Sequence, residues 1–225
     1  AHAVVTHMDP SRYRPVLIGI SPAGEWFHFT GDAAQIARDT WLTPQHCTPA
    51  FVSPSRGDRA LLVLEGGCVK KIPLDAAFPV LHGRNGEDGT VQGVFETAGI
   101  PLAGCGVLSS ALCMDKDRAH QLARSAGAAV PASFVVERGM DAGAVLERAE
   151  RLGYPLFVKP VRAGSSFGVS RVEGPEQLDG AVRAALAYDR RVLLEEAVSG
   201  FEVGCAVLGS EELTVGLVDE IQLSG

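Results

Sequence analysis

A loop rich in glycine and serine follows a strand-like segment that ends in a lysine. The run Tyr154–Pro160 is apolar up to Lys159, and Gly164-Ser-Ser-Phe-Gly168 comes shortly after it. Such a loop presents backbone N–H groups and two hydroxyls that suit phosphate oxygens, and a lysine beside it adds a point charge. A flexible surface hairpin with an edge lysine is the alternative explanation. No Gly-Lys-Ser/Thr closes the loop, so it is not a Walker A motif.

Lysine is scarce in this chain, which makes each lysine informative. Only four of the 20 basic residues are lysines, and the others are arginines. Lys116 follows Met114-Asp115 at the expected start of a helix, where a cation opposes the helix dipole unless an anion shares the site. An ordinary surface lysine is the alternative. Lys116 and Lys159 are therefore candidates for binding an anionic ligand.

Two further segments place polar groups at the ends of expected strands. In Leu194–Glu202, carboxylates could accept hydrogen bonds from an adenine amino group or ribose hydroxyls, and backbone groups at Glu196 and Val198 could pair with the edge of the base. A solvated acidic strand end is the alternative explanation of this segment. In Leu81–Gly89, His82 ends a strand that we expect to be parallel, and glycines recur at positions 83, 86 and 89. Open α/β sheets bind ligands at such strand ends. A structurally satisfied histidine is the alternative there.

Composition and charge exclude several classes of protein. Hydrophobic residues make up 46% of 225, enough for a core, and no apolar run approaches the length of a membrane span. A net charge of −7 argues against a nucleic-acid or anionic-membrane surface, although it leaves room for a nucleotide. Residues 1–15 have no signal-peptide pattern, and the five scattered cysteines fit a reducing compartment, so we expect a cytoplasmic protein.

Alternating apolar periodicities predict an α/β protein with two domains that meet in Gly99–Gly106. Helices are expected over residues 90–98, 115–125, 141–152 and 175–188. Strands are expected over residues 15–20, 50–53, 60–64, 68–72, 76–81, 133–137, 155–159, 169–172, 191–195, 202–208 and 213–221.

Four motifs in this order resemble the D-alanine–D-alanine ligase family of the ATP-grasp fold. They are LHGRNGEDGTVQGVFETAGIP, SSALCMDK, YPLFVKPVRAGSSFGVS and LLEEAVSGFEVGCAVLG. SSFGV, AVSGFEVGCAVLG and VDEIQL are closer still to the vancomycin-resistance D-alanine–D-lactate ligases. The resemblance covers nearly the whole chain. It implies an N-terminal open α/β domain (pre-ATP-grasp, Rossmann-like) over residues 1–103, a central ATP-grasp subdomain with the phosphate loop over 104–190, and the start of a C-terminal ATP-grasp subdomain over 191–225.

The resemblance also implies a role for individual residues. Lys116 and Lys159 match lysines on the ATP phosphates, and Ser165 and Ser166 match the loop that closes over the γ-phosphate and the first D-alanine. His82 and Glu87 match residues on the substrate side, and with Ser165 they form the implied catalytic group. Glu202 matches the carboxylate on the ribose. The residues that match the adenine pocket are Phe157, Glu195, Glu196, Ala197 and Val198.

The implied reaction is phosphoryl transfer from ATP to D-alanine, followed by attack of D-lactate on the acyl phosphate, for peptidoglycan precursors that resist glycopeptides. A D-alanine–D-alanine or D-alanine–D-serine ligase is the alternative, because the ω-loop that chooses the second substrate is absent. The family's first strand and glycine loop are also absent, and its Mg²⁺ ligands lie beyond Gly225. We therefore expect no turnover from these residues alone. A non-catalytic nucleotide-binding fragment is the rival from another class, and the resemblance suggests a homodimer.

Overall fold

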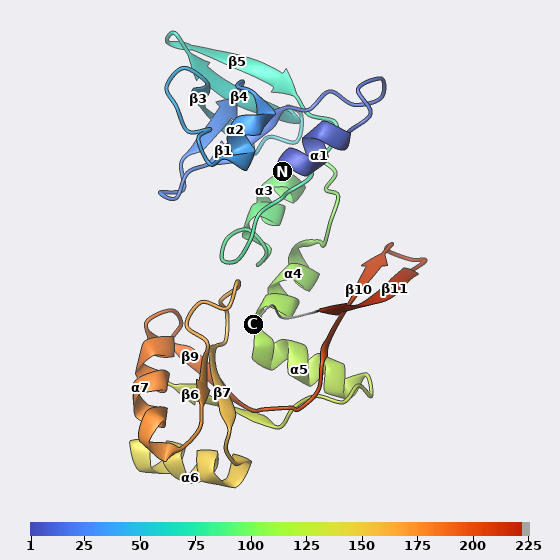
Figure 1. Cartoon of the computed structure of the whole chain (residues 1–225). Coiled ribbons are helices and arrows are strands. Elements are labelled where there is room, and N and C mark those ends of the chain that lie inside the picture. The colour runs from blue at the N-terminus through green and yellow to red at the C-terminus, as the bar shows by residue number, and fades with distance from the viewer. Residues whose placement is uncertain (222–225) are drawn as a thin grey trace. The chain divides into compact units, whose positions relative to one another are not determined.

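The chain folds into two compact units in the computed structural model, which describes residues 1–221 (Figure 1). The first unit comprises Ala1–Ala126 together with Val161–Phe167, and the second comprises Gly127–Pro160 and the chain from Gly168 onward. The chain thus crosses between the units three times. Two of the crossings have a glycine at positive φ, Gly127 at +84° and Gly168 at +70°. The three-part division at residues 103/104 and 190/191 stays a prediction.

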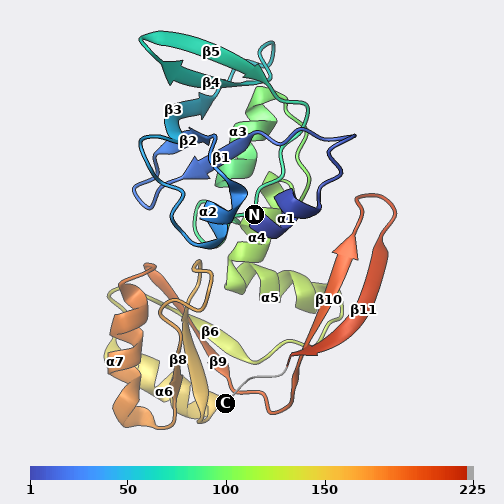
Figure 2. The same ribbon diagram turned by 45° about the horizontal axis from the view of Figure 1, so that its top comes forward.

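The first unit is built on an antiparallel meander whose five strands follow one another in chain order (Figure 2). Its strands are β1 (Leu17–Ile20), β2 (Trp26–Phe29), β3 (Cys47–Val52), β4 (Ala60–Glu65) and β5 (Cys68–Pro73), and its helices are α1 (His2–His7), α2 (Ala33–Ala37), α3 (Thr90–Ala98), α4 (Val107–Met114) and α5 (Lys116–Ser125).

Helix α3 supplies much of the core of the first unit. Its residues Val91, Phe95 and Ala98 recur at helical spacing, and all three are buried in one cluster with Leu61 and Val63 of β4. The helix ends where Gly99 adopts φ +70°, with its N–H donating to the carbonyl of Glu96 at 3.1 Å. The predicted helix and its glycine stop are both confirmed.

The segment Ala76–Leu81 is not the strand that its apolar run predicted. Only Ala77 makes an isolated parallel bridge, to Leu102. Pro79 has no N–H to donate and the neighbouring Phe78 is 58% exposed, so the run does not continue a ladder, although Ala77 and Leu81 pack against the core of the first unit. His82 therefore follows an irregular segment, and both large sheets are antiparallel. Helices α1, α2 and α4 and strand β2 were not predicted from the sequence.

The second unit has a four-stranded antiparallel sheet in the order β6-β9-β7-β8, with two helices packed against it. Its strands are β6 (Ser133–Glu137), β7 (Leu156–Pro160), β8 (Ser170–Val172) and β9 (Arg191–Glu196), and its helices are α6 (Ala142–Leu152) and α7 (Pro175–Leu186). All of these elements were predicted, within a few residues at their ends.

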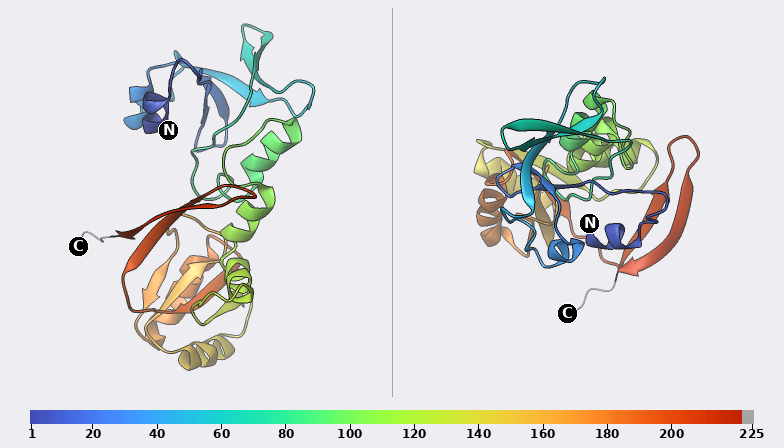
Figure 3. Two further views of the ribbon diagram at one scale, coloured as in Figure 1. Left: turned by 90° about the vertical axis from the view of Figure 1, so that its right-hand side faces the viewer. Right: turned by 90° about the horizontal axis from the view of Figure 1, so that it is seen from above.

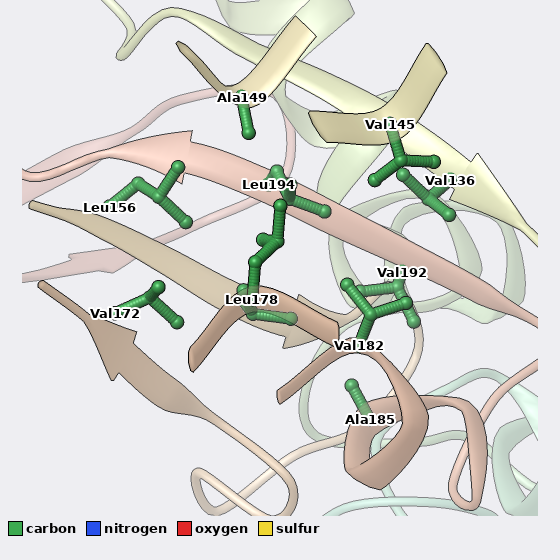
Figure 4. Close-up of a cluster of buried hydrophobic side chains, with 11 residues drawn as sticks. Val136, Val145, Ala149, Leu156, Val172, Leu178, Val182, Ala185, Val192 and Leu194 are labelled. Atoms are coloured by element: carbon green, nitrogen blue, oxygen red, sulfur yellow. The ribbon is translucent and has the colours of Figure 1, made fainter. Parts of the chain in front are cut away.

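Alternate residues of the two central strands β7 and β9 pack against α6 and α7 (Figure 4). Leu156 and Val158 of β7 and Val192 and Leu194 of β9 are all fully buried in this cluster. Because side chains alternate between the faces of a sheet, residues 157, 159, 193 and 195 belong to the opposite face.

A two-stranded ribbon completes the described chain. Strands β10 (Glu202–Leu208) and β11 (Thr214–Ile221) pair with each other, and within residues 1–221 neither joins the four-stranded sheet (Figure 3). Nearly all their residues are exposed, including Leu217 at 88%. Of the segment VDEIQL, Gln222 and Leu223 lie outside the described residues. No described helix is long and apolar enough to cross a membrane.

The core assignment of the second unit predicts a large difference between two leucine truncations. Leu194 is fully buried, so Leu194→Ala should lower the free energy of unfolding by about 2–5 kcal/mol through lost contacts and a cavity. Leu217→Ala removes the same atoms from an exposed side chain and should change the free energy of unfolding by less than about 0.5 kcal/mol. Urea denaturation followed by circular dichroism measures both, and equal losses would contradict the assignment.

Asp88 holds the turn that leads into α3. One carboxylate oxygen accepts from the N–H of Asn85 at 2.8 Å and the other from the N–H of Thr90 at 3.1 Å. Burial by itself would raise the pKa of Asp88, but the hydrogen bonds from Asn85 and Thr90 outweigh it and leave the pKa below its ordinary value. The ionised carboxylate thus supplies the cap that Gly89, which precedes the helix, cannot provide.

We predict that Asp88→Ala lowers the free energy of unfolding by about 1 kcal/mol at neutral pH. Because the folded-state pKa is depressed, this contribution is present above the ordinary pKa and is lost as the pH falls through the folded value. The deficit relative to wild type should therefore shrink in acid. Asp75→Ala, at an exposed position with no such turn, is the control. Denaturation series at neutral and acidic pH test this, and a deficit independent of pH would contradict it.

Candidate functional site

Three of the predicted ligand-binding residues meet on the face of the second sheet that lies opposite α6 and α7. Phe157 of β7 pairs directly with Glu195 of β9, and Lys159 lies two residues further along the same face. The Lys159 ammonium forms an ion pair with the Glu195 carboxylate and lies 5.1 Å from the centre of the Phe157 ring. The structure therefore joins an aromatic face, a cation and a carboxylate that are 38 residues apart in sequence.

The Lys159–Glu195 ion pair is well shielded from water. The side chains are only 23% and 10% exposed, so solvent screens their attraction weakly. Breaking a shielded pair of this kind by removing one member is strongly unfavourable. An anionic ligand that reaches Lys159 would compete with Glu195 for the same ammonium group.

Glu196, the last residue of β9, and Ala197 after it form hydrogen bonds within the protein. The Glu196 carboxylate accepts from the N–H of Ala132 at 2.8 Å, and the Glu196 N–H donates to the Ala132 carbonyl at 3.0 Å. The Ala197 N–H donates to the Pro155 carbonyl at 3.2 Å. Val198 is 69% exposed, and within residues 1–221 its N–H has no such partner. Of the predicted backbone contacts, the Val198 N–H is the one left available for a base edge.

Glu202 lies apart from this cluster. It is the first residue of β10, where it pairs with Ile221, and it is exposed. No contact of the described residues joins it to Glu195, so the predicted ribose contact stays a prediction.

Lys116 holds the glycine- and serine-rich loop to the first unit. Its ammonium donates to the carbonyl of Ala163 at 2.7 Å, and its backbone N–H donates to the carbonyl of Val161 at 3.1 Å. Asp115 caps α5 by accepting from the N–H of Arg118 at 3.1 Å. This carboxylate at the helix start offsets the unfavourable placement of a lysine beside the positive end of the helix dipole.

Ser165 and Ser166 occupy the centre of a tight turn. The Phe167 N–H donates to the Gly164 carbonyl at 3.2 Å, and the serines have φ +50° and +58°. Two positive φ values inside such a turn are typical of type I′, which favours glycine and asparagine. For residues with a Cβ this conformation costs roughly 1–2 kcal/mol each. Both serines are exposed, so their hydroxyls are accessible.

His82 and Glu87 lie on one loop of the first unit. The Glu87 carboxylate accepts from the N–H of Gly83 at 2.5 Å, and its other oxygen lies 3.9 Å from Nδ1 of His82. The His82 side chain is 79% exposed. A cavity of about 450 Å³ in the same unit has both Glu87 and Lys116 in its wall. Other residues of this wall are Leu81, Gln92, Ser109 and Cys113.

Gln92 fixes this loop and was missed from the sequence. It is 7% exposed on α3, and its side-chain amide donates to the carbonyl of Gly86 at 2.8 Å. The available signal was a glutamine next to Val91 on the apolar face of a predicted helix, because a buried amide needs a specific partner. Gln92 thereby holds the glycine loop against the helix that follows it.

The described residues do not form a metal site. Across residues 1–221, no three His, Cys, Asp or Glu side chains gather in a way that could hold a metal ion.

Comparison with known proteins agrees with the resemblance drawn from the motifs. The family described as "D-ala D-ala ligase N-terminus" matches residues 1–105, and "D-ala D-ala ligase C-terminus" matches residues 122–225. A Streptomyces coelicolor protein named "Putative D-alanine--D-lactate ligase" is 47% identical over the whole chain, and the Enterococcus faecalis vancomycin B-type resistance protein VanB is 43% identical over 98% of it. The chain spans 62% and 61% of these two proteins.

A solved structure supports the same relationship. The VanG D-Ala:D-Ser ligase from Enterococcus faecalis matches 98% of this chain with a TM-score of 0.89 and 48% sequence identity, and the chain covers 64% of it. The predicted fold class, an N-terminal α/β domain followed by part of an ATP-grasp fold, is confirmed by this match and by the two family descriptions. Together the two descriptions account for nearly all of the sequence, and the chain belongs to the D-alanine–D-alanine ligase family.

Proposed function

We propose that the protein is an ATP-dependent ligase that activates the carboxylate of D-alanine as an acyl phosphate and joins it to D-lactate. The observation that carries the nucleotide part is the Phe157, Lys159 and Glu195 cluster on the sheet face opposite α6 and α7. The name of the Streptomyces relative supports D-lactate as the second substrate. The family description and the name of the VanG ligase favour D-alanine and D-serine, which remain the alternatives.

In the proposed nucleotide site, the adenine lies against the Phe157 ring and its amino group donates to the Glu195 carboxylate. Of the backbone groups of Glu196, Ala197 and Val198 predicted at the base edge, the Val198 N–H is the one that pairs there, because the N–H groups of Glu196 and Ala197 already donate to carbonyls of the protein. Lys159 exchanges its ion pair with Glu195 for the phosphates, and Glu202 accepts from the ribose. This proposal is supported by the burial of the ion pair, which strengthens any electrostatic contact made there.

We assign Lys116, Ser165 and Ser166 to phosphate contacts, and His82 and Glu87, with Ser165, to the side of the acid substrate. Phosphoryl transfer depends mainly on positioning and on neutralising charge, which lysines and hydroxyls can supply. The first D-alanine would present a carboxylate oxygen to the γ-phosphate. The second substrate would then attack the acyl phosphate through its hydroxyl or amine and release phosphate.

Magnesium is the expected cofactor of the family, and within residues 1–221 no three His, Cys, Asp or Glu side chains gather to hold it. We further propose a cytoplasmic role in peptidoglycan precursor synthesis, a homodimer, and resistance to glycopeptides through the altered precursor. A nucleotide-binding protein without ligase activity is the competing function. It predicts ATP binding without phosphate release when D-alanine is added.

The nucleotide proposal predicts that Lys159→Met weakens ATP binding by at least about tenfold, equivalent to about 1.4 kcal/mol. Titration calorimetry on the 225-residue chain measures this. Lys70→Met, which removes an exposed lysine from β5, is the matched control and should leave the affinity unchanged. Glu195→Gln should reduce the preference for ATP over GTP. Equal affinity of Lys159→Met and wild type would contradict the phosphate role.

The substrate proposal predicts an ester product in a competition assay. The product of the intact gene is incubated with ATP, D-alanine and D-lactate, and the products are identified by mass spectrometry. We expect D-alanyl-D-lactate with release of phosphate that depends on D-alanine. Dipeptide alone at every pH would replace D-lactate with D-alanine as the second substrate. Binding of ATP without phosphate release would favour the non-catalytic alternative.

A further inference from the structure

The loop that carries Ser165 and Ser166 packs with the first unit, although both of its ends continue into strands of the second. Val161–Phe167 groups with the first unit, while β7 ends at Pro160 and Gly168 belongs to the second unit. Two hydrogen bonds from Lys116 hold the loop at Val161 and Ala163. The loop is thus docked on the first unit and is not a free hairpin of its own sheet.

A contact between two glycines lies at the centre of this docking. A Cβ atom added to Gly164 would lie 2.7 Å from the Cα of Gly83, 3.2 Å from the Gly83 nitrogen and 3.6 Å from a Glu87 carboxylate oxygen. A distance of 2.7 Å is shorter than any that real Cβ atoms make, and the atom in the way is rigid backbone. No residue other than glycine fits at position 164 unless the two loops move apart.

The need for glycine at position 164 is steric. Its φ lies outside the left-handed region, so an alanine can adopt the same backbone conformation without strain. Gly83 differs, because its φ of +69° itself favours glycine. The Gly83 N–H also donates to Glu87, so the residue that Gly164 touches is the one that orients the Glu87 carboxylate.

We propose that Gly83 and Gly164 form a docking contact that positions Ser165 and Ser166 against His82 and Glu87. Because the backbones touch, the hydroxyls of one loop and the carboxylate of the other are set relative to each other and shift together. Gly83 and Gly164 are thus positioning residues. The docking stands on geometry alone, and its meaning for the reaction rests on the proposed function.

Limited proteolysis tests the docking without any assay of activity. Arg162 is the only basic residue in Val161–Phe167 and is exposed, so trypsin cuts after it as soon as the backbone there opens. Gly164→Ala should raise the cleavage rate at this bond at least about tenfold, because the methyl group lifts the loop. Peptide mass spectrometry of the 225-residue chain measures the rate against a reference site elsewhere in the chain.

Two further variants make the result specific. Gly57→Ala adds the same methyl group in the first unit where no atom lies within 4 Å, and it should leave cleavage after Arg162 unchanged. Lys116→Met removes the hydrogen bond to Ala163 and should raise cleavage, because it releases the same loop from a second anchor. Cleavage of Gly164→Ala at the wild-type rate would overturn the proposal.

Hydrogen exchange on the wild-type chain settles the case in which Gly164→Ala fails to fold. Docking predicts that the amides of residues 82–87 and 161–167 are protected together and become exposed at the same low urea concentration. Exchange of residues 161–167 at the rate of a free peptide, with residues 82–87 still protected, would overturn the proposal.

The role in positioning is measured separately in the product of the intact gene. Gly164→Ala should lower kcat about 10–100-fold, because small displacements of reacting groups are costly, while the Kd for ATP changes less than kcat does. Absence of ligase activity in wild type would defeat the proposed function but leave the proteolysis result standing. Unchanged kcat in a variant whose loop is released would defeat the positioning role.

Discussion

The two-residue alternation of β7 and β9 decides where polar chemistry can occur in the second unit. Helices α6 and α7 cover one face of the sheet and bury Leu156, Val158, Val192 and Leu194 there. The residues between them in sequence must lie on the other face, and Phe157, Lys159 and Glu195 therefore meet there. A slip of one residue in either strand would place the charged side chains under the helices and move the leucines to the opposite face. The hydrophobic core therefore sets the register of the candidate nucleotide site.

The ion pair on that face makes the site responsive to its occupant. Lys159 and Glu195 form an ion pair in a shielded environment, so each stabilises the other, and separating them is energetically unfavourable. A nucleotide offers replacements for both at once, an anion for the lysine and a hydrogen-bond donor for the carboxylate. A ligand that offers one replacement alone breaks the shielded pair and replaces only one of its two interactions. In the proposed function, this requirement favours binding of a whole nucleotide over binding of base or phosphate alone.

Local signals were sufficient for much of the fold and insufficient for the geometry of the site. Helix α3 was predicted with both ends because its apolar spacing and Gly99 are local features. The segment Ala76–Leu81 was misread because an apolar run looks the same whether or not a partner strand exists. The meeting of Lys159 with Glu195 depends on pairing across distant strands, and the contact of Gly164 with Gly83 depends on tertiary packing. Neither is encoded in a short window of sequence.

The tight turn at Ser165 and Ser166 bears on how far this protein could be made more robust. Both positions have backbone angles at which glycine is less strained than serine. Replacing either serine with glycine is thus an obvious stabilising change by conformational criteria, and each would delete a hydroxyl that we place at the phosphates. Selection for thermostability alone would favour glycine at these two positions. In this loop the backbone conformation that favours glycine and the hydroxyls proposed for activity therefore make opposite demands on the same two positions.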